Sequence, residues 1–96
     1  MQFYVVCRIK PGTHRKAVIG LIRSEAKAAW KLYEAGLVRD IHYIDDLSGA
    51  VMTFEAKDLA EVKTAVETLP MIQQGILEPE YIPLKPYTGF GKLFAK

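Results

Sequence analysis

The sequence LIRSEAKAAWKLYEAG, residues 21 to 36, predicts a long helix. Its apolar residues recur at intervals of three and four, which is typical of a helix that packs one face against a core. Because each residue turns a helix by about 100°, Glu25 falls at the centre of that apolar face. Its neighbours on the helical wheel are all apolar: Val18, Leu21, Ile22, Ala28, Ala29 and Leu32. The pattern therefore places a carboxylate where a core residue is expected.

Extended segments flank this helix on both sides. Residues 2–9, QFYVVCRI, are short, β-branched and aromatic, which favours a strand. Thr13 is the expected N-cap of a helix that starts near His14, and Gly36 is the expected C′ residue. The segments 37–45 and 50–56 are expected to pair as strands through the turn DDLSG.

The second half of the chain repeats the order of helix and strand. The segment KDLAEVKTAVETL, residues 57–69, predicts a helix capped by Asp58, with Glu61 in the capping-box position and Pro70 at its end. Residues 75–87 predict a fourth extended segment, whose prolines favour an edge position. The chain ends in an aromatic tail, about residues 87–96, which carries Phe90 and Phe94.

This order of elements predicts an α+β fold, the ferredoxin-like βαββαβ arrangement with a four-stranded antiparallel sheet and two helices on one face. Both faces of the first two strands carry apolar side chains, and one chain would leave such a surface exposed. We therefore expect a homodimer that packs sheet against sheet, a dimeric α+β barrel, with the tail reaching over the partner or the groove.

Composition excludes several classes of protein. The 96 residues predict a single domain, 1–96, and a net charge of +2 with 25% charged residues gives no sign of nucleic-acid binding. The sequence shows no signal peptide and no membrane-spanning segment, so we expect a cytoplasmic protein. The one cysteine, Cys7, lies in an apolar run, which predicts a buried thiol and no disulfide.

Glu25 has two interpretations. In the first, it has no catalytic role: the helix is rotated so that Glu25 lies at the rim of the apolar face, or Glu25 forms a structural ion pair with Arg23, Lys27 or a cation of the sheet. Alternatively, the helix lines an apolar pocket in which burial raises the pKa of the carboxyl group, so that Glu25 carries protons near neutral pH. The alanines at positions 26, 28 and 29 leave room beside it, which favours the second interpretation.

The segment after Gly36 supplies the other candidate site residues. Asp40 and His42 are two residues apart and share a strand face, so they form a candidate acid–base or substrate-orienting pair. The alternative is a polar patch at an interface or a solvated strand end. Arg39 is a candidate for holding an anionic substrate through two hydrogen bonds, or for pairing with Glu25. One His and one Asp are too few ligands for a metal site.

The sequences LIRSEAKAAWKLYEAGLVRDIHYI, SGAVMTFEA and LPMIQQGILEPEYIPLKPY resemble the muconolactone isomerase-like family of small dimeric α+β barrels. The resemblance implies an enzyme that needs no cofactor and moves a proton across an allylic system in a carboxylate-bearing lactone. It places the acid on Glu25 and the arginine on Arg39, and it implies dimers that can build larger rings.

Two hypotheses of function follow. In the first, the protein is a cofactor-independent isomerase acting on a small unsaturated or lactone carboxylic acid, or a cofactor-free monooxygenase or cyclase of the same fold. Its catalytic residues are Glu25 and His42, and the substrate contacts Arg39, Ile22, Ala29 and Tyr43. In the second, the protein is a non-catalytic module that binds a small ligand or forms oligomers, and Glu25 is structural.

Overall fold

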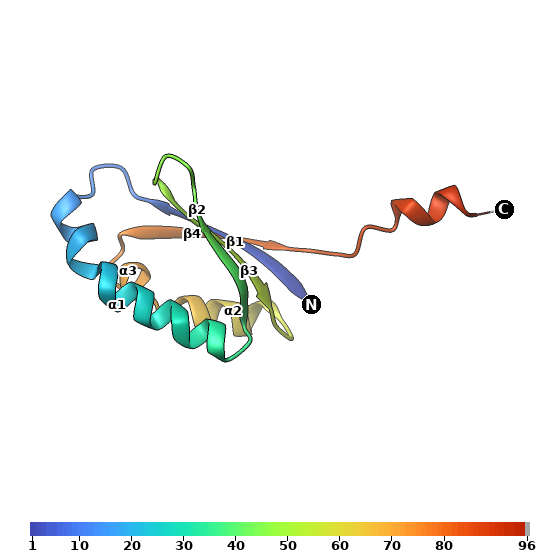
Figure 1. The fold of residues 1–96 in the computed structure, drawn as a ribbon, viewed down its shortest axis with the longest axis horizontal. Helices are drawn as coiled ribbons and strands as arrows, with labels where there is room; N and C mark the ends of the chain where they lie inside the picture. The colour runs from blue at the N-terminus through green and yellow to red at the C-terminus, as the bar shows by residue number, and fades with distance from the viewer. Residues whose placement is uncertain (96) are drawn as a thin grey trace.

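The computed structural model describes residues 1–95 and has the predicted α+β architecture. Its sheet has the strand order β2-β3-β1-β4, with every neighbouring pair antiparallel, and Figure 1 shows the helices gathered on one side of it. This is the ferredoxin-like order. The elements are β1 (Gln2–Ile9), α1 (Arg15–Glu34), β2 (Val38–Tyr43), β3 (Gly49–Glu55), α2 (Leu59–Val66), α3 (Pro70–Gln73), β4 (Leu77–Pro83) and the 3₁₀ helix η1 (Gly89–Leu93).

Helix α1 ends as the sequence predicts and begins differently. Gly36 adopts a φ of 79°, and the amides of Gly36 and Leu37 donate to the carbonyls of Tyr33 and Leu32, which completes a Schellman motif. At the other end the N-cap is His14, without a side-chain cap bond. Thr13 does not cap the helix because its hydroxyl donates to the carbonyl of Lys10 at 2.7 Å and closes the preceding turn.

The second helical region is divided in two. Asp58 caps α2 by accepting from the amide of Glu61 at 2.9 Å, as predicted, and Glu61 accepts from the amide of Lys57. Helix α2 is shorter than predicted, and Pro70 begins the four-residue helix α3 instead of only ending α2. Proline suits this first helical position because the amide it lacks has no partner there anyway.

A register shift in β2 changes which of its residues share a face. Val38 pairs with Phe54, but Asp40 pairs with Thr53, so the bulge falls at Arg39. Strict alternation predicts that Val38 shares a face with Asp40 and His42. The bulge instead places Val38 on the face of Ile41 and Tyr43, which is the face that the helices cover.

The core lies between the sheet and the helices. Phe3, Val5, Cys7 and Phe54 come from the two central strands, and each is at most 1% exposed. The helical side contributes a second set of buried side chains: Leu32, Val62, Ala65, Val66, Leu69 and Met71. Among residues 1–95, no helix combines the length and the apolar character needed to cross a bilayer.

Two apolar surfaces are covered only in part in one chain. The open face of the sheet presents Tyr4, Val6, Val51 and Ile82 from neighbouring strands. The segment after β4 leads away from the body of the molecule, as Figure 1 shows in orange and red, and it gives the chain a longest dimension of 59 Å. Its large apolar side chains are between 68% and 83% exposed: Tyr87, Phe90, Leu93 and Phe94. The last residue of the predicted tail, Lys96, lies outside the described residues.

Candidate functional site

The half-buried carboxylate of Glu25 caps the short helix α3. Its Oε1 accepts a hydrogen bond of 2.9 Å from the backbone amide of Met71, 46 residues away in the sequence. Met71 is the second residue of α3, and the N-cap residue Leu69 offers no side-chain acceptor to this turn. Since the first amides of a helix have no partner within the helix, the carboxylate satisfies one of them from another element.

Burial determines the protonation of Glu25. Loss of solvent raises the pKa of the carboxyl group above its ordinary value of 4.5, and the hydrogen bond from Met71 offsets part of that rise. No cation pairs with this carboxylate among residues 1–95, where the ion pairs are Met1 with Glu55 and His42 with Asp40. Only Oε1 is held by a hydrogen bond from the described residues, so Oε2 is available for another partner.

We expect the stability of the protein to record this pKa. A carboxyl group whose pKa is raised in the folded state binds protons more tightly there than in the unfolded chain, so its stabilising contribution is lost as pH rises above 4.5. Urea unfolding of the wild type and of Glu25→Gln at pH 4 and pH 7 measures this. The wild type should lose stability relative to the variant between the two pH values, and a relative gain would contradict the assignment.

Cys7 belongs to the core on the face of β1 that the helices cover, and it is fully buried. Burial, and to a smaller extent the negative charge of Glu25, raises the pKa of the Cys7 thiol to about 12. A thiol with this pKa stays protonated at physiological pH, and the thiolate is the reactive form. The structure therefore supports the prediction of a buried, inert cysteine.

The reactivity of Cys7 gives a simple check of this packing. In the native protein at pH 8, an aromatic disulfide reagent should release no chromophore on the timescale on which it reacts with the urea-unfolded chain. Reaction at equal rates in both states would show that the thiol is accessible in the folded protein.

Tyr81 is a partly buried residue of this region. It pairs with Val5 across β4 and β1, so it lies on the face covered by helices. Burial is the main cause that raises the pKa of the Tyr81 phenol, and electrostatic repulsion from Cys7 and Glu67 raises it further. The ammonium of Lys63 lies 5.6 Å from the centre of its ring, within cation–π range.

The candidate substrate contacts on α1 flank Glu25. Ala29 is partly buried and packs against the core, whereas Ile22 is 49% exposed. Ile22 belongs to an apolar flank of the helix together with Ile19, Trp30 and Tyr33, and the last two rings stack with centroids 5.5 Å apart.

The candidate residues of β2 lie apart from Glu25. His42 pairs with Val51 and Asp40 with Thr53, which places both on the open face of the sheet, opposite the helices. Their side chains are exposed, and His42 Nδ1 lies 4.0 Å from Asp40 Oδ1, so this pair contributes little to stability. Tyr43 is on the face covered by helices but stands at the edge of the sheet, 76% exposed.

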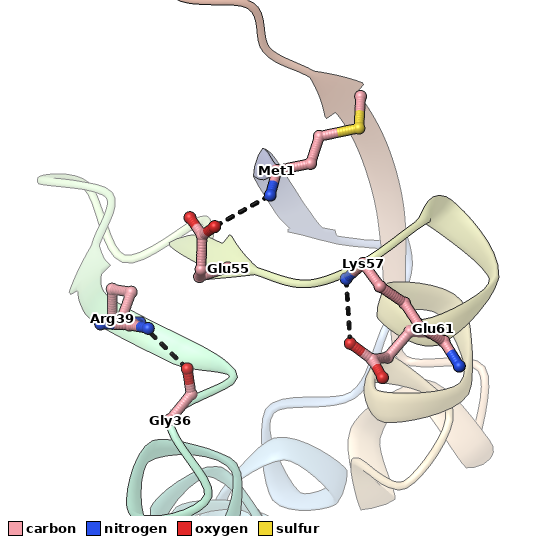
Figure 2. A network of polar contacts seen from close by, with 6 residues as sticks. All are labelled: Met1, Gly36, Arg39, Glu55, Lys57 and Glu61. Carbon is pink, nitrogen blue, oxygen red and sulfur yellow. Dashed lines mark hydrogen bonds and ion pairs between the residues drawn. The ribbon is translucent and has the colours of Figure 1, made fainter.

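Arg39 does not form the ion pair with Glu25 that the sequence allowed. Its Nε donates to the carbonyl of Gly36 at 3.0 Å, so the side chain folds back over the end of α1. Figure 2 shows this contact beside the ion pair between the N-terminal amine and Glu55. The guanidinium is exposed and lowers the pKa of Glu55 slightly, after the larger effect of the N-terminal amine.

The sequence reasoning missed the contact between Glu25 and Met71, since a backbone amide has no residue-type signal. The only sequence signal for a helix start near Met71 is the proline at position 70 after Leu69, because proline is favoured in the first turn of a helix. Within residues 1–95, no three His, Cys, Asp or Glu side chains gather in a way that could hold a metal ion.

Together, the βαββαβ fold and the half-buried carboxylate define a small α+β domain that carries a candidate proton-transfer group. The chain belongs to the muconolactone delta-isomerase family, whose model matches residues 1–89. The family and its fold are those of enzymes that convert small molecules.

Two solved structures share the fold. One is the 5-chloro-2-hydroxyhydroquinone dehydrochlorinase TftG from Burkholderia phenoliruptrix AC1100 in complex with 2,5-dihydroxybenzoquinone, with a TM-score of 0.76 and 18% identity over 93% of this chain and 98% of that one. The other is muconolactone isomerase, with a TM-score of 0.73 and 17% identity over 91% of each chain. No curated protein matches the sequence.

Proposed function

We propose that this protein is a cofactor-independent isomerase that moves a proton within a small unsaturated or lactone carboxylic acid, with Glu25 as the proton carrier. The observation that carries the proposal is the setting of Glu25: a half-buried carboxyl group with a raised pKa, fixed through one oxygen by the Met71 amide. A raised pKa brings the group closer to the operating pH, where a general acid–base works best.

The proposed reaction uses one residue for two steps. The Glu25 carboxylate removes a proton from the carbon at one end of an allylic system, and the electron pair moves into the conjugated carbonyl as an enolate. The carboxylic acid then returns the proton at the other end. The net change is a shift of one hydrogen and one double bond, so no oxidant or cofactor is consumed.

The remaining site residues are proposed as substrate contacts. Ile22 and Ala29 lie next to Glu25 on α1, and they would contact the apolar part of the substrate. Arg39 and Tyr43 stand along the β2 edge, apart from Glu25, so they would hold an acidic group only of a substrate that extends to this edge or of one bound by a second protomer. His42 lies on the far face of the sheet, so its acid–base role requires a substrate or a second protomer that reaches around this edge.

A proton NMR assay in D₂O tests the proposal. Muconolactone, the substrate in the family's name, and related unsaturated carboxylic acids are incubated with the protein, and each C–H signal is followed. Isomerisation, or loss of the allylic C–H signal through exchange with deuterium, is the expected result. Unchanged spectra for the whole series at several pH values would count against an isomerase.

One observation favours the second candidate function, a non-catalytic module that binds small ligands. Glu25 has a structural task, because it caps α3 and thereby joins α1 to the segment before β4. A residue with this task can be present without any chemistry. Tight binding of an unsaturated acid without its consumption, in the same samples, would support this alternative over the isomerase.

We also propose that the protein is a homodimer that packs the open faces of two sheets together and uses the tail to reach its partner. On the open face Ile82 is 37% exposed and Tyr4 and Val51 are partly exposed, and the aromatic residues of the tail are exposed as well. The radius of gyration, 15.6 Å, exceeds the value of about 13 Å for a compact domain of about 100 residues, which reflects the projecting tail.

Truncation after Pro86 tests the role of the tail. The full chain should show at least twice the mass of one chain in light scattering, and removal of residues 87–96 should shift the equilibrium towards the monomer. The large side chains of the tail are exposed in their own chain, so the truncated protein should keep the circular dichroism of the remaining fold. A monomeric mass for the full chain would contradict the dimer.

A further inference from the structure

A groove runs along the helical layer between α1 and the turn that follows α2. Its volume is about 480 Å³, and it is lined by Ser24, Lys27, Ala28, Lys31, Leu32 and Thr68. Ala28 and Leu32 give it an apolar floor. Glu25 is not among the lining residues, and the groove lies on the side of α1 opposite to Ile22 and Ala29, although Ala28 and Leu32 border Glu25 as well.

Two cations stand on one wall of the groove. Lys27 and Lys31 are four residues apart on α1, which places their side chains on the same side of the helix. The ion pairs among residues 1–95 involve Met1, Glu55, Asp40 and His42, so no carboxylate neutralises either lysine within 4.0 Å. Both ammonium groups can therefore approach one anionic group in the groove.

The hydroxyl groups that line the groove can only accept further hydrogen bonds. Ser24 Oγ donates to the carbonyl of Leu21 at 3.1 Å, and Thr68 Oγ1 donates to the carbonyl of Ala65 at 2.6 Å. Each hydroxyl has a single hydrogen, so only its lone pairs remain for a ligand. A ligand that suits both features carries an acid for the lysines and a hydroxyl donor for Ser24 or Thr68.

A neighbouring groove opposes the reverse orientation of such a ligand. It has a volume of about 520 Å³, shares Leu32 and Thr68 with the first, and continues to Asp58 and Glu61. Each of these two carboxylates already accepts a hydrogen bond from a backbone amide at the start of α2. Lys57 also lines this second groove, so its end carries two carboxylates and one ammonium group, whereas the first groove carries two lysines and no carboxylate. This difference in charge favours a ligand carboxylate at the end with Lys27 and Lys31.

We propose that this groove is a binding site for small hydroxylated aromatic or unsaturated carboxylic acids. The carboxylate lies between Lys27 and Lys31, the flat apolar part covers Ala28 and Leu32, and the ligand hydroxyl donates to Ser24 or Thr68. The site does not depend on chemistry at Glu25.

The test is an NMR titration of the full ¹⁵N-labelled chain with 4-hydroxybenzoate. The amides of Ser24, Ala28, Leu32 and Thr68 should shift in a saturable way. The neutral isostere 4-hydroxybenzamide has the same shape without the charge, and it should bind at least about tenfold more weakly. The Lys27→Gln/Lys31→Gln variant should lose about the same factor for 4-hydroxybenzoate.

A matched control removes the same charge elsewhere. Lys10→Gln/Lys16→Gln should bind 4-hydroxybenzoate as the wild type does, because neither lysine lines the groove. Equal binding of the benzamide, equal weakening by the two lysine pairs, or shifts centred on β2 would overturn the proposal.

Discussion

Glu25→Gln should lower the rate of proton transfer by about 10² to 10⁴-fold, the range that general acid–base groups contribute. Glutamine has nearly the same shape and keeps an oxygen that can accept from the Met71 amide, which Glu25 binds at 2.9 Å. It cannot take up a proton, so catalysis is lost while the cap of α3 is retained. The rate is measured as isomerisation or deuterium uptake by NMR.

Two further variants show whether the loss is chemical. Glu34→Gln removes an exposed carboxylate from the same helix and should leave the rate unchanged. Glu25→Ala should lose both the rate and the cap, at a cost of about 0.5–2 kcal/mol in the free energy of unfolding. If Glu25→Gln retains full activity with a proven substrate, Glu25 is not the proton carrier and its role is to cap α3.

Gly49→Ala should destabilise the protein by about 3 kcal/mol, because it forces a methyl group into backbone. A Cβ at this position would lie 1.9 Å from the carbonyl oxygen of Cys7 and 3.0 Å from the Cα of Arg8. Gly49 begins β3 and pairs with Arg8 in the central strand β1. The clash therefore separates the two strands that carry most of the core.

The matched control is Gly20→Ala in α1. No atom lies within 4 Å of a Cβ at that position, and alanine favours a helix over glycine by about 1 kcal/mol. Urea unfolding should show opposite shifts of the midpoint for the two variants. A Gly49→Ala midpoint equal to that of the wild type would show that β1 and β3 do not approach as closely as described.

Local signals in the sequence predicted most of the fold. The apolar repeat of α1, Gly36 and the cap at Asp58 are each decided by neighbouring residues, and the structure reproduces them. Thr13 was wrong as a cap because its hydroxyl had a competing acceptor in the turn. The bulge at Arg39 was missed because alternation assumes one residue per pleat.

The candidate site was less accessible to sequence reasoning. The helical wheel correctly marked Glu25 as a carboxylate on the apolar face, but it could not name a partner 46 residues away. A helix of four residues gives no periodic signal in the sequence, so neither α3 nor the bond from its Met71 amide to Glu25 was predicted. The positions of Arg39 and His42 away from Glu25 follow from strand pairing, which a single sequence does not determine.

The most direct test of the account is the pKa of the Glu25 side chain, measured by NMR titration of the protein labelled with ¹³C at the glutamate carboxyl carbons. The Glu25 signal is assigned as the carboxyl signal that is missing from the spectrum of the Glu25→Gln variant. We predict a midpoint above 4.5, because burial raises the pKa of Glu25 by more than the hydrogen bond from Met71 lowers it. A midpoint at or below 4.5 would show a solvated or strongly stabilised carboxylate and would contradict Glu25 as a proton carrier near neutral pH.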